Sequence, residues 1–240
     1  MLQNNNNALT AKLRIAEIFH SVQGEGIWAG IPSTFIRVSG CNLRCVWCDT
    51  PYASWNPEGP TLTIDEILDQ VRQADLDHVV LTGGEPMLFD AIEPLARQLK
   101  AEGKTITIET AGTLYRDLPC DLMSISPKLA HSTPTEDLAW AKRHDDLRLQ
   151  PDILRQMIAS YPFQLKFVVS SPDAQEITEI ESLLDQIGPV EPSKVLLMPE
   201  GRDQATLWQK ARLLIPIVTA RNWRLAPRLQ IDLFGDTRGT

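Results

Sequence analysis

Cys41-Asn-Leu-Arg-Cys45-Val-Trp-Cys48 places three cysteines within eight residues, so their thiolates can hold one metal centre together. They cannot complete it, because a structural zinc ion and a ferredoxin-type iron–sulfur cluster both take four ligands. The fourth cysteine of the chain, Cys120, lies far along the sequence and has no companion motif. A cubane cluster held by three thiolates leaves one iron free for a small molecule. The spacing therefore predicts a centre that is held for chemistry rather than for structure.

Two alternatives to a chemically active cluster stay open for these cysteines. One is a zinc site with three cysteines and one histidine, and the other is a set of unrelated buried thiols. No histidine lies within 20 residues of the three cysteines, and His20 is the nearest. The zinc interpretation therefore lacks an obvious fourth ligand.

Length and composition are those of an ordinary enzyme domain. A chain of 240 residues with 43% apolar residues can form one α/β domain with a full core. Its net charge of -8 argues against a nucleic-acid partner, which would require a basic surface. Clustered cysteines are typical of a metal site in the reducing cytoplasm, and no apolar run is long enough to cross a membrane. We expect residues 1–10, which are polar, to be a disordered tail before a single domain over residues 11–240.

Strand and helix patterns alternate along the chain, which predicts parallel strands joined by right-handed crossovers. Thr63-Ile-Asp-Glu66 is a capping box that opens a helix with Ile64, Ile67, Leu68 and Val71 on one face. The segment 127–149 is less regular and is expected to be a loop or an insertion. The other predicted helices lie near residues 90–103, 151–160, 174–187 and 203–221. The predicted strands cover residues 34–39, 78–82, 104–109, 121–126, 164–169, 194–198 and 228–234.

Polar and glycine-rich motifs follow five of the predicted strands, each at the C-terminal end of its strand. In barrel-type α/β folds this rim is where active sites are built. One such motif alone is more often a turn. Their shared position beside the cysteine loop predicts one wide site for a large cofactor and a substrate. The motifs are Gly83-Gly84-Glu85-Pro86, Glu109-Thr110-Ala111-Gly112, Ser126-Pro127-Lys128, Ser170-Ser171 and Met198-Pro199-Glu200-Gly201.

The cysteine spacing resembles the signature of the radical S-adenosylmethionine (SAM) superfamily, in which the amino and carboxylate groups of SAM chelate the open iron of a [4Fe-4S] cluster. Glu17-Ile-Phe-His-Ser-Val-Gln-Gly-Glu-Gly26, Cys48-Asp49-Thr50, Thr82-Gly-Gly-Glu-Pro86 and Ser126-Pro-Lys128 make the resemblance closer. From about residue 17 to residue 201 the chain is similar to the 7-carboxy-7-deazaguanine synthase family. The resemblance implies a partial parallel β/α barrel. It also implies a lyase that converts 6-carboxy-5,6,7,8-tetrahydropterin to 7-carboxy-7-deazaguanine with loss of ammonia, for queuosine-type nucleosides.

Two residues suit the chemistry of that substrate. A tetrahydropterin presents a guanidine-like edge of N–H donors, for which the Glu25 carboxylate is a natural acceptor. The substrate carboxylate calls for a cation, preferably the planar fork of arginine, and Arg37 lies mid-strand before the cysteines. The alternative for Glu25 is an exposed acid in a turn, and the alternative for Arg37 is an arginine that caps a sheet edge. The resemblance adds to the substrate contacts Val22, Gln23, Gly24 and Thr82.

The cofactor contacts are implied by the resemblance alone. Thr50 matches a Mg²⁺ position, where a neutral hydroxyl leaves most of the coordination to substrate oxygens and waters. No catalytic side chain is implied beyond the cluster and cofactor ligands. A homodimer and an external one-electron donor such as flavodoxin or ferredoxin are implied too. The SAM contacts are Gly84 and Glu85 at the methionine amino group, Ser126, Pro127 and Lys128 at its carboxylate or ribose, and Met198, Pro199, Glu200 and Gly201 around the adenine.

Alternatives stay open for the role of the last residues of the chain and for the class of activity. Residues 228–240 do not align with relatives whose last residues approach the substrate. Gln230 and Asp232 are candidates for that polar role, and a free tail is the alternative. Two other function classes also stay open. One is an activase that delivers a radical to a glycine of a partner protein, and the other is a non-enzymatic metal-binding module.

Overall fold

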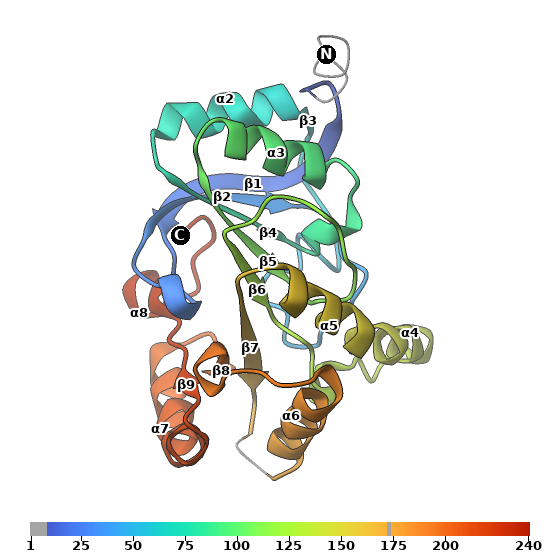
Figure 1. Ribbon diagram of the computed structural model, residues 1–240, viewed down its shortest axis with the longest axis vertical. Helices are drawn as coiled ribbons and strands as arrows, with labels where there is room; N and C mark the ends of the chain where they lie inside the picture. Colours follow the sequence, from blue (N-terminus) through green and yellow to red (C-terminus); the bar gives the residue numbers. More distant parts are fainter. Residues whose placement is uncertain (1–8, 172–173) are drawn as a thin grey trace.

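The computed structural model describes residues 9–171 and 174–240, which form one mixed sheet with the strand order β3-β1-β2-β4-β5-β6-β7-β8-β9 (Figure 1). From β2 to β9 all neighbouring strands are parallel. The order does not return from β9 to β3, so the sheet is the partial barrel that was expected. The strands are β1 (Lys12–Val22), β2 (Pro32–Val38), β3 (Thr61–Thr63), β4 (His78–Gly83), β5 (Thr105–Thr110), β6 (Leu122–Ile125), β7 (Phe163–Val169), β8 (Val195–Pro199) and β9 (Arg224–Leu225).

Most of the helices cover the outer side of this sheet (Figure 1). The predicted capping box is confirmed, because the Thr63 hydroxyl accepts from the Glu66 N–H and the Glu66 carboxylate accepts from the Thr63 N–H. The apolar face predicted for that helix is buried. The helices are α2 (Ile64–Ala74), α3 (Ile92–Ala101), α4 (Leu138–Arg148), α5 (Pro151–Ser160), α6 (Ala174–Ile187), α7 (Gln204–Arg221) and α8 (Leu229–Phe234).

Alternation along the parallel strands separates the core from the site. Successive residues of a strand point to opposite faces, so one set faces the helices and the next set faces the inside of the barrel. The outward set is apolar and belongs to the main core, with Ile36, Leu81, Ile108, Phe167 and Leu197 as members. The inward set is largely polar and lines a cavity, with Arg37, Thr82, Glu109, Lys166 and Met198 as members.

The start of the sheet corrects the sequence analysis, in which residues 34–39 were the first strand and all pairing was parallel. An earlier strand, β1, pairs antiparallel with both β2 and β3. The connection from β1 to β2 holds only the short 3-10 turn η1 (Gly26–Trp28). It is too short for the crossover that parallel strands need. The motif at residues 17–26 is therefore the second half of a strand and the turn that follows it.

The predicted last strand, residues 228–234, is wrong, because this segment forms the helix α8. Its alternating leucines and isoleucine suggested a strand. However, β9 already occupies the edge beside β8, and Ile231 is the only buried residue of the helix. The segment therefore leaves the sheet and crosses toward the cavity instead of extending the barrel.

The irregular segment 127–149 contains a helix that the sequence analysis did not predict. This helix, α4, has no apolar stripe, and His144 is its only buried residue. Leu138 at its start has 81% of its surface exposed. Because helix prediction depends on an apolar face, the pattern gave no signal here. Figure 1 shows α4 projecting to one side of the barrel.

Of the tail expected over residues 1–10, residues 1–8 lie outside the described part of the chain, whereas Leu9 packs against the core. In the described part, no helix combines the length and apolarity that a bilayer crossing requires.

Candidate active site

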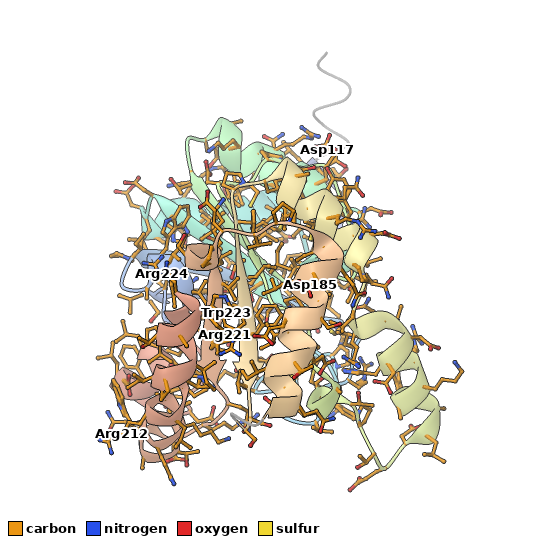
Figure 2. All side chains as sticks on the ribbon, turned by 60° about the horizontal axis from the view of Figure 1, so that its bottom comes forward. Asp117, Asp185, Arg212, Arg221, Trp223 and Arg224 are labelled. Carbon is orange, nitrogen blue, oxygen red and sulfur yellow. The ribbon has the colours of Figure 1, made fainter. Side chains whose placement is uncertain are left out.

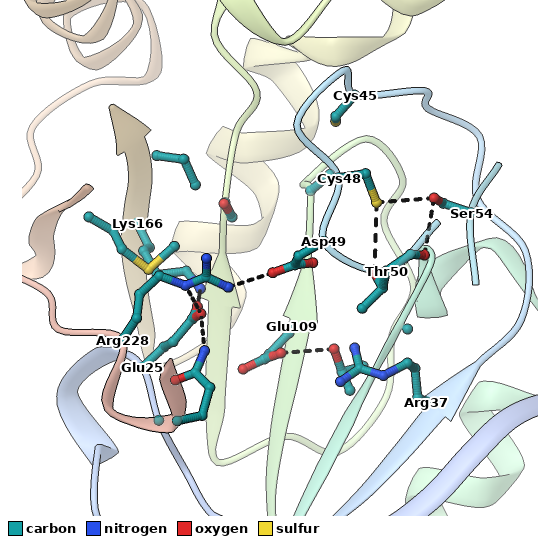
Figure 3. Close-up of a pocket in the computed structure, with 18 of the residues that line it drawn as sticks. Glu25, Arg37, Cys45, Cys48, Asp49, Thr50, Ser54, Glu109, Lys166 and Arg228 are labelled. Carbon is teal, nitrogen blue, oxygen red and sulfur yellow. Dashed lines mark hydrogen bonds and ion pairs between the residues drawn. The ribbon is translucent and has the colours of Figure 1, made fainter. Parts of the chain in front are cut away.

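A cavity of about 230 Å³ lies at the C-terminal ends of the parallel strands (Figure 3). All three clustered cysteines line it, as do the turn after β1 and the ends of β2, β4, β5, β6, β7 and β8. The expected common rim is confirmed for four of the five strand-end motifs. Ser170 and Ser171 are the exception, since they do not line the cavity and donate instead to Glu176 near the start of α6.

The cysteine loop is held in shape by hydrogen bonds, most of which end on its own backbone carbonyls. The Leu43 N–H donates to Cys41 Sγ at 3.3 Å. Arg44 Nη1 donates to the carbonyls of Cys41 at 2.9 Å and Leu43 at 2.7 Å, which turns the chain back on itself. Trp55 Nε1 donates to the Cys45 carbonyl at 3.0 Å. These bonds orient the three thiols toward the same cavity without a disulfide.

The three thiols fit a [4Fe-4S] cluster better than a single ion. Among residues 9–171 and 174–240, no three His, Cys, Asp or Glu side chains gather closely enough for one metal ion. The cysteines instead line one shared cavity, where a cluster of several atoms could bind all three, and no histidine among the described residues lines it. Burial raises the pKa of both Cys41 and Cys45 to about 12. Cluster binding must therefore displace the thiol protons.

Cys120 is separate from this loop. It does not line the cavity, and its thiol lies 3.8 Å from the carbonyl oxygen of Ile106 on β5. Burial raises its pKa to about 12, as expected of an inert structural thiol.

Glu25 does not face the cavity as a free acceptor. It forms an ion pair with Lys166, accepts from Arg228 Nε at 3.1 Å and from Gln230 Nε2 at 2.8 Å (Figure 3). Burial alone would raise the pKa of Glu25, but Lys166 and Arg228 outweigh it and hold that pKa well below its ordinary value. Glu25 is therefore ionised and neutralised by two cations that the sequence analysis did not identify.

Arg228 connects three parts of the site. Besides Glu25, its guanidinium donates to the carbonyl of Gly201 at 2.6 Å and to Asp49 at 2.5 Å. Burial would lower the pKa of Arg228, but Glu25 and Asp49 outweigh it and raise that pKa. One buried arginine thus links the turn after β1, the segment after the cysteines and the end of β8.

Arg37 lies on the inward face of β2, directly opposite Glu17 of β1. Its Nε donates to Glu17 Oε1 at 2.7 Å, and its guanidinium lies 5.6 Å from the ring centre of Phe19. The Tyr52 hydroxyl donates to the same Glu17 oxygen at 2.8 Å. Cross-strand pairs of opposite charge stabilise a sheet, and this pair also fixes where Arg37 points.

A second carboxylate, Glu109 of β5, shares the cavity with Arg37. Glu109 Oε2 accepts from the Thr82 hydroxyl at 2.8 Å, and Oε1 accepts from Gln23 Nε2 at 3.2 Å. Gln23 Oε1 in turn accepts from the Glu25 N–H at 3.1 Å. The turn after β1 and the ends of β4 and β5 therefore form one hydrogen-bonded unit. Of the expected substrate residues, all line the cavity: Val22, Gln23, Gly24, Glu25, Arg37 and Thr82.

The expected SAM residues divide into two groups. Gly84, Ser126, Lys128, Met198, Glu200 and Gly201 line the cavity, whereas Glu85, Pro127 and Pro199 do not. Lys128 Nζ donates to the carbonyl and the hydroxyl of Ser126, each at 2.8 Å. Glu85 is fully buried and accepts from Thr110 Oγ1 at 2.7 Å, the Ala111 N–H at 2.8 Å and the Met87 N–H at 3.0 Å. Burial raises its pKa.

Thr50 and the C-terminal segment also reach the cavity. Thr50 Oγ1 lies 3.7 Å from Cys48 Sγ, and Asp49 beside it supplies a carboxylate to the same wall. Gln230 and Thr240 line the cavity, so the tail is not free. Asp232 is directed elsewhere and accepts from Trp208 Nε1 at 3.1 Å.

Gly84 is needed because the end of β4 packs backbone against backbone on the cysteine loop. A Cβ at Gly84 would lie 2.1 Å from the carbonyl oxygen of Gly40 and 2.6 Å from that of Ala53. We therefore expect Gly84→Ala to lower the free energy of unfolding by about 1–3 kcal/mol and to reduce bound iron, because the loop must move.

Gly188→Ala is the control for that change. Gly188 lies at the end of α6 with a φ of +96° and no atom within 4 Å of an added Cβ. The control should lose some stability through backbone strain and keep its full iron content. Thermal unfolding and iron analysis of both variants test this, and full iron in Gly84→Ala would contradict it.

Comparison with known proteins extends the similarity beyond the cysteine motif. A family model described as the radical SAM superfamily matches residues 35–133. A 7-carboxy-7-deazaguanine synthase of Halobacterium salinarum is 44% identical in an alignment covering 95% of this chain and 93% of the relative. One from Rhodopirellula baltica is also 44% identical, covering 97% of this chain and 91% of the relative. The crystal structure of QueE from Escherichia coli aligns with a TM-score of 0.69 at 26% identity, covering 92% of this chain and 96% of that chain.

Proposed function

This chain belongs to the 7-carboxy-7-deazaguanine synthase family of the radical SAM superfamily, and from that premise we propose how its own residues hold substrate and cofactors. It is an iron–sulfur lyase that converts 6-carboxy-5,6,7,8-tetrahydropterin to 7-carboxy-7-deazaguanine with loss of ammonia. When bound, the [4Fe-4S] cluster and SAM supply the radical chemistry that starts this reaction. The activase and the non-enzymatic metal-binding alternatives are set aside by this membership.

The observation that carries the site assignment is one shared cavity. Cys41, Cys45 and Cys48 line it together with Arg37 and the strand-end motifs. Cluster, SAM and substrate must meet within reach of one another, and a single cavity with cysteines at one wall and carboxylates with an arginine at another satisfies that requirement. We assign the three cysteines to the cluster.

Arg37 holds the substrate carboxylate in this proposal. Its hydrogen bond to Glu17 uses only Nε, so the remaining guanidinium N–H groups stay available to the cavity. Burial would lower the pKa of Arg37, but nearby Tyr52 and Glu17 outweigh it and raise that pKa. The guanidinium is thus charged at every working pH, and its planar fork matches a carboxylate.

The N–H edge of the pterin lies between Glu109 and Glu25 in this proposal. Glu25 already accepts from two cations and one amide, whereas the hydrogen bonds to Glu109 come from the neutral side chains of Thr82 and Gln23. A guanidine-like edge is therefore favoured beside Glu109, with Glu25 as the second acceptor. The backbone of Val22 and Gly24 contributes from the same turn.

SAM lies along the opposite wall in this proposal. Gly84 lets its backbone approach the methionine amino group, while Ser126 and Lys128 face the carboxylate or ribose. Glu85 acts from behind this wall, because its buried carboxylate orients the N–H groups of Ala111 and Met87. The turn at residues 198–201 surrounds the adenine. We also propose that Mg²⁺ binds at Thr50, with Asp49 as a nearby hard oxygen donor.

Arg37→Ala tests this assignment. The variant should keep its cluster and some SAM cleavage without substrate, because neither depends on the pterin. Product formation should fall roughly ten- to hundredfold, since a charge-assisted hydrogen bond contributes about 1.5–3 kcal/mol. Arg37→Lys should recover only part of the loss, because an ammonium cannot form the bidentate fork. Anaerobic turnover and substrate affinity are the measurements, and wild-type values for Arg37→Ala would refute the assignment.

The remaining proposals come from the resemblance. We propose a single radical SAM domain over residues 11–240, supported by the continuous sheet that joins its described parts. We also propose an external one-electron donor such as flavodoxin or ferredoxin, a homodimer and a cytoplasmic location. The four free cysteines support a reducing compartment.

A further inference from the structure

The chain after α8 returns to the start of the sheet, where Arg238 contacts β1. Figure 1 shows the C-terminal end beside β1, on the inner side of the helices. Arg238 Nη2 donates to the carbonyl of Ala16 at 3.0 Å. The β1–β2 register shifts between Ile15 and Glu17, so Ala16 is the residue that a β-bulge leaves out of the ladder. The bulge thus supplies a backbone acceptor for a residue more than 200 positions away.

Arg238 is held on three further sides. Its Nε donates to Glu17 Oε2 at 3.1 Å, and its Nη1 pairs with Glu58. Its guanidinium lies 3.9 Å from the ring centre of Tyr52. The side chain is nevertheless 47% exposed, so ion pairing in this place adds little to stability by itself. The hydrogen bond from Arg238 to Glu17 therefore matters for the arrangement of the site rather than for stability.

Glu17 is shared between Arg238 and the proposed substrate ligand Arg37. Glu17 Oε1 accepts from Arg37 Nε and from the Tyr52 hydroxyl, whereas Oε2 accepts from Arg238. A carboxylate with a free second oxygen forms a bidentate pair with arginine. Without Arg238, Glu17 Oε2 would be available to a second N–H group of Arg37.

We propose that Arg238 is a positioning residue for the substrate. By occupying Glu17 Oε2, it prevents Arg37 from closing a bidentate pair with Glu17 and keeps the outer N–H groups of Arg37 for the substrate carboxylate. This inference rests on the proposed role of Arg37. The same contacts hold the tail in place while Thr240, two residues further on, lines the cavity.

Arg238→Ala tests the proposal through substrate binding rather than turnover alone. The dissociation constant of 6-carboxy-5,6,7,8-tetrahydropterin is measured by anaerobic calorimetry on the holoenzyme with SAM and without reductant, so that no turnover occurs. We expect it to rise roughly tenfold, because one charge-assisted bond to the substrate is lost. SAM cleavage without substrate should stay unchanged. Arg212→Ala, at an exposed position on α7 outside the cavity wall, is the control and should bind normally (Figure 2).

A second-site variant separates this role from a merely structural one. In Glu17→Gln the amide oxygen still accepts from Arg37, but the amide nitrogen cannot accept a second N–H group. Glu17→Gln combined with Arg238→Ala should therefore bind substrate more tightly than Arg238→Ala alone. If Arg238 only anchored the tail, the double variant would bind substrate more weakly than Arg238→Ala alone, because the two losses of affinity would add.

Two further variants keep this inference and the proposed function distinguishable. Glu58→Ala removes another partner of Arg238 without touching Glu17, and it should bind substrate like the wild type. A tenfold loss in Glu58→Ala would overturn the inference in favour of simple anchoring, as would wild-type affinity in Arg238→Ala. Wild-type affinity in Arg37→Ala would overturn the proposed substrate site and this inference with it.

Discussion

Replacing any one of Cys41, Cys45 and Cys48 by alanine should abolish both cluster binding and product formation. The three thiols line one cavity, and within residues 9–171 and 174–240 no histidine or other cysteine lines it that could replace a missing ligand. Two thiolates do not hold a stable cubane, so the expected iron and sulfide content after anaerobic reconstitution is close to zero. The fold should persist, because the side chains of Arg44 and Trp55 hold the loop through its backbone carbonyls.

Cys120→Ala is the matched control for these variants. Its thiol is partly buried and also has a raised pKa, but it lies beside Ile106 near the start of β5 and packs against the main core instead of lining the cavity. This variant should keep the full complement of iron and wild-type turnover, with only a modest loss of packing. Loss of the cluster in Cys120→Ala would mean that the fourth iron has a protein ligand, and the open-iron assignment would then fail.

Glu25→Ala should have the second largest effect, on stability and on activity together. The change leaves Lys166 and Arg228 without their shared carboxylate, and both side chains are only 8% exposed. Removing one partner of a buried ion pair costs about 3–5 kcal/mol, because the remaining charges stay desolvated. Product formation should fall as well, since Arg228 also positions Asp49 and the end of β8. Denaturant unfolding and anaerobic turnover are the measurements.

Glu93→Ala provides the contrast for Glu25→Ala. Glu93 pairs with Arg97 one helical turn away on α3, where both side chains are about half exposed. Such pairs contribute only about 0.3–0.5 kcal/mol, so this variant should be nearly neutral. An equal loss of stability in the two variants would show that the cluster around Glu25 is not desolvated as the structure indicates.

The contribution of Glu25 to the stability of the fold should also decrease as the pH falls. The folded state holds the pKa of Glu25 below its ordinary value, so ionised Glu25 stabilises the fold. That contribution is fully present above the unfolded pKa of about 4.3 and is lost as the pH falls below it. The stability difference between the wild type and Glu25→Gln should therefore shrink under acidic conditions. A difference that grows with acidity would contradict the ion-pair assignment.

The sequence was informative where the chemistry is local. The cysteine spacing, the capping box at Thr63 and the strand-end motifs each lie within a few residues, so their geometry follows from short-range chain constraints. Most strand and helix limits were also predictable, because buried parallel strands are continuous apolar runs between helical patterns. Lys166 carried a signal that was missed, and Glu109 was named in a strand-end motif but not as a substrate residue. Each is a charged residue within an apolar strand, at the position where the side chain faces inward.

The antiparallel start of the sheet and the helices α4 and α8 needed the tertiary structure. β1 is long, but its second half belongs to the motif at residues 17–26, whose polar residues hid the strand. In α4 no apolar stripe exists, and in α8 the apolar alternation is that of a strand although the sheet edge is already taken by β9. Only the position of neighbouring elements decides such cases.

The family and the three cysteines that we propose as cluster ligands could thus be read from the sequence itself, because three thiolates within eight residues can reach one centre in almost any fold. The charge pattern around the cavity was decided by the tertiary structure alone. Glu25 meets Lys166 across 141 residues and Arg228 across 203, and Arg238 reaches Glu17 across 221. No local spacing predicts such contacts, since loop closure over these distances is determined by the packing of the whole barrel rather than by the residues that meet.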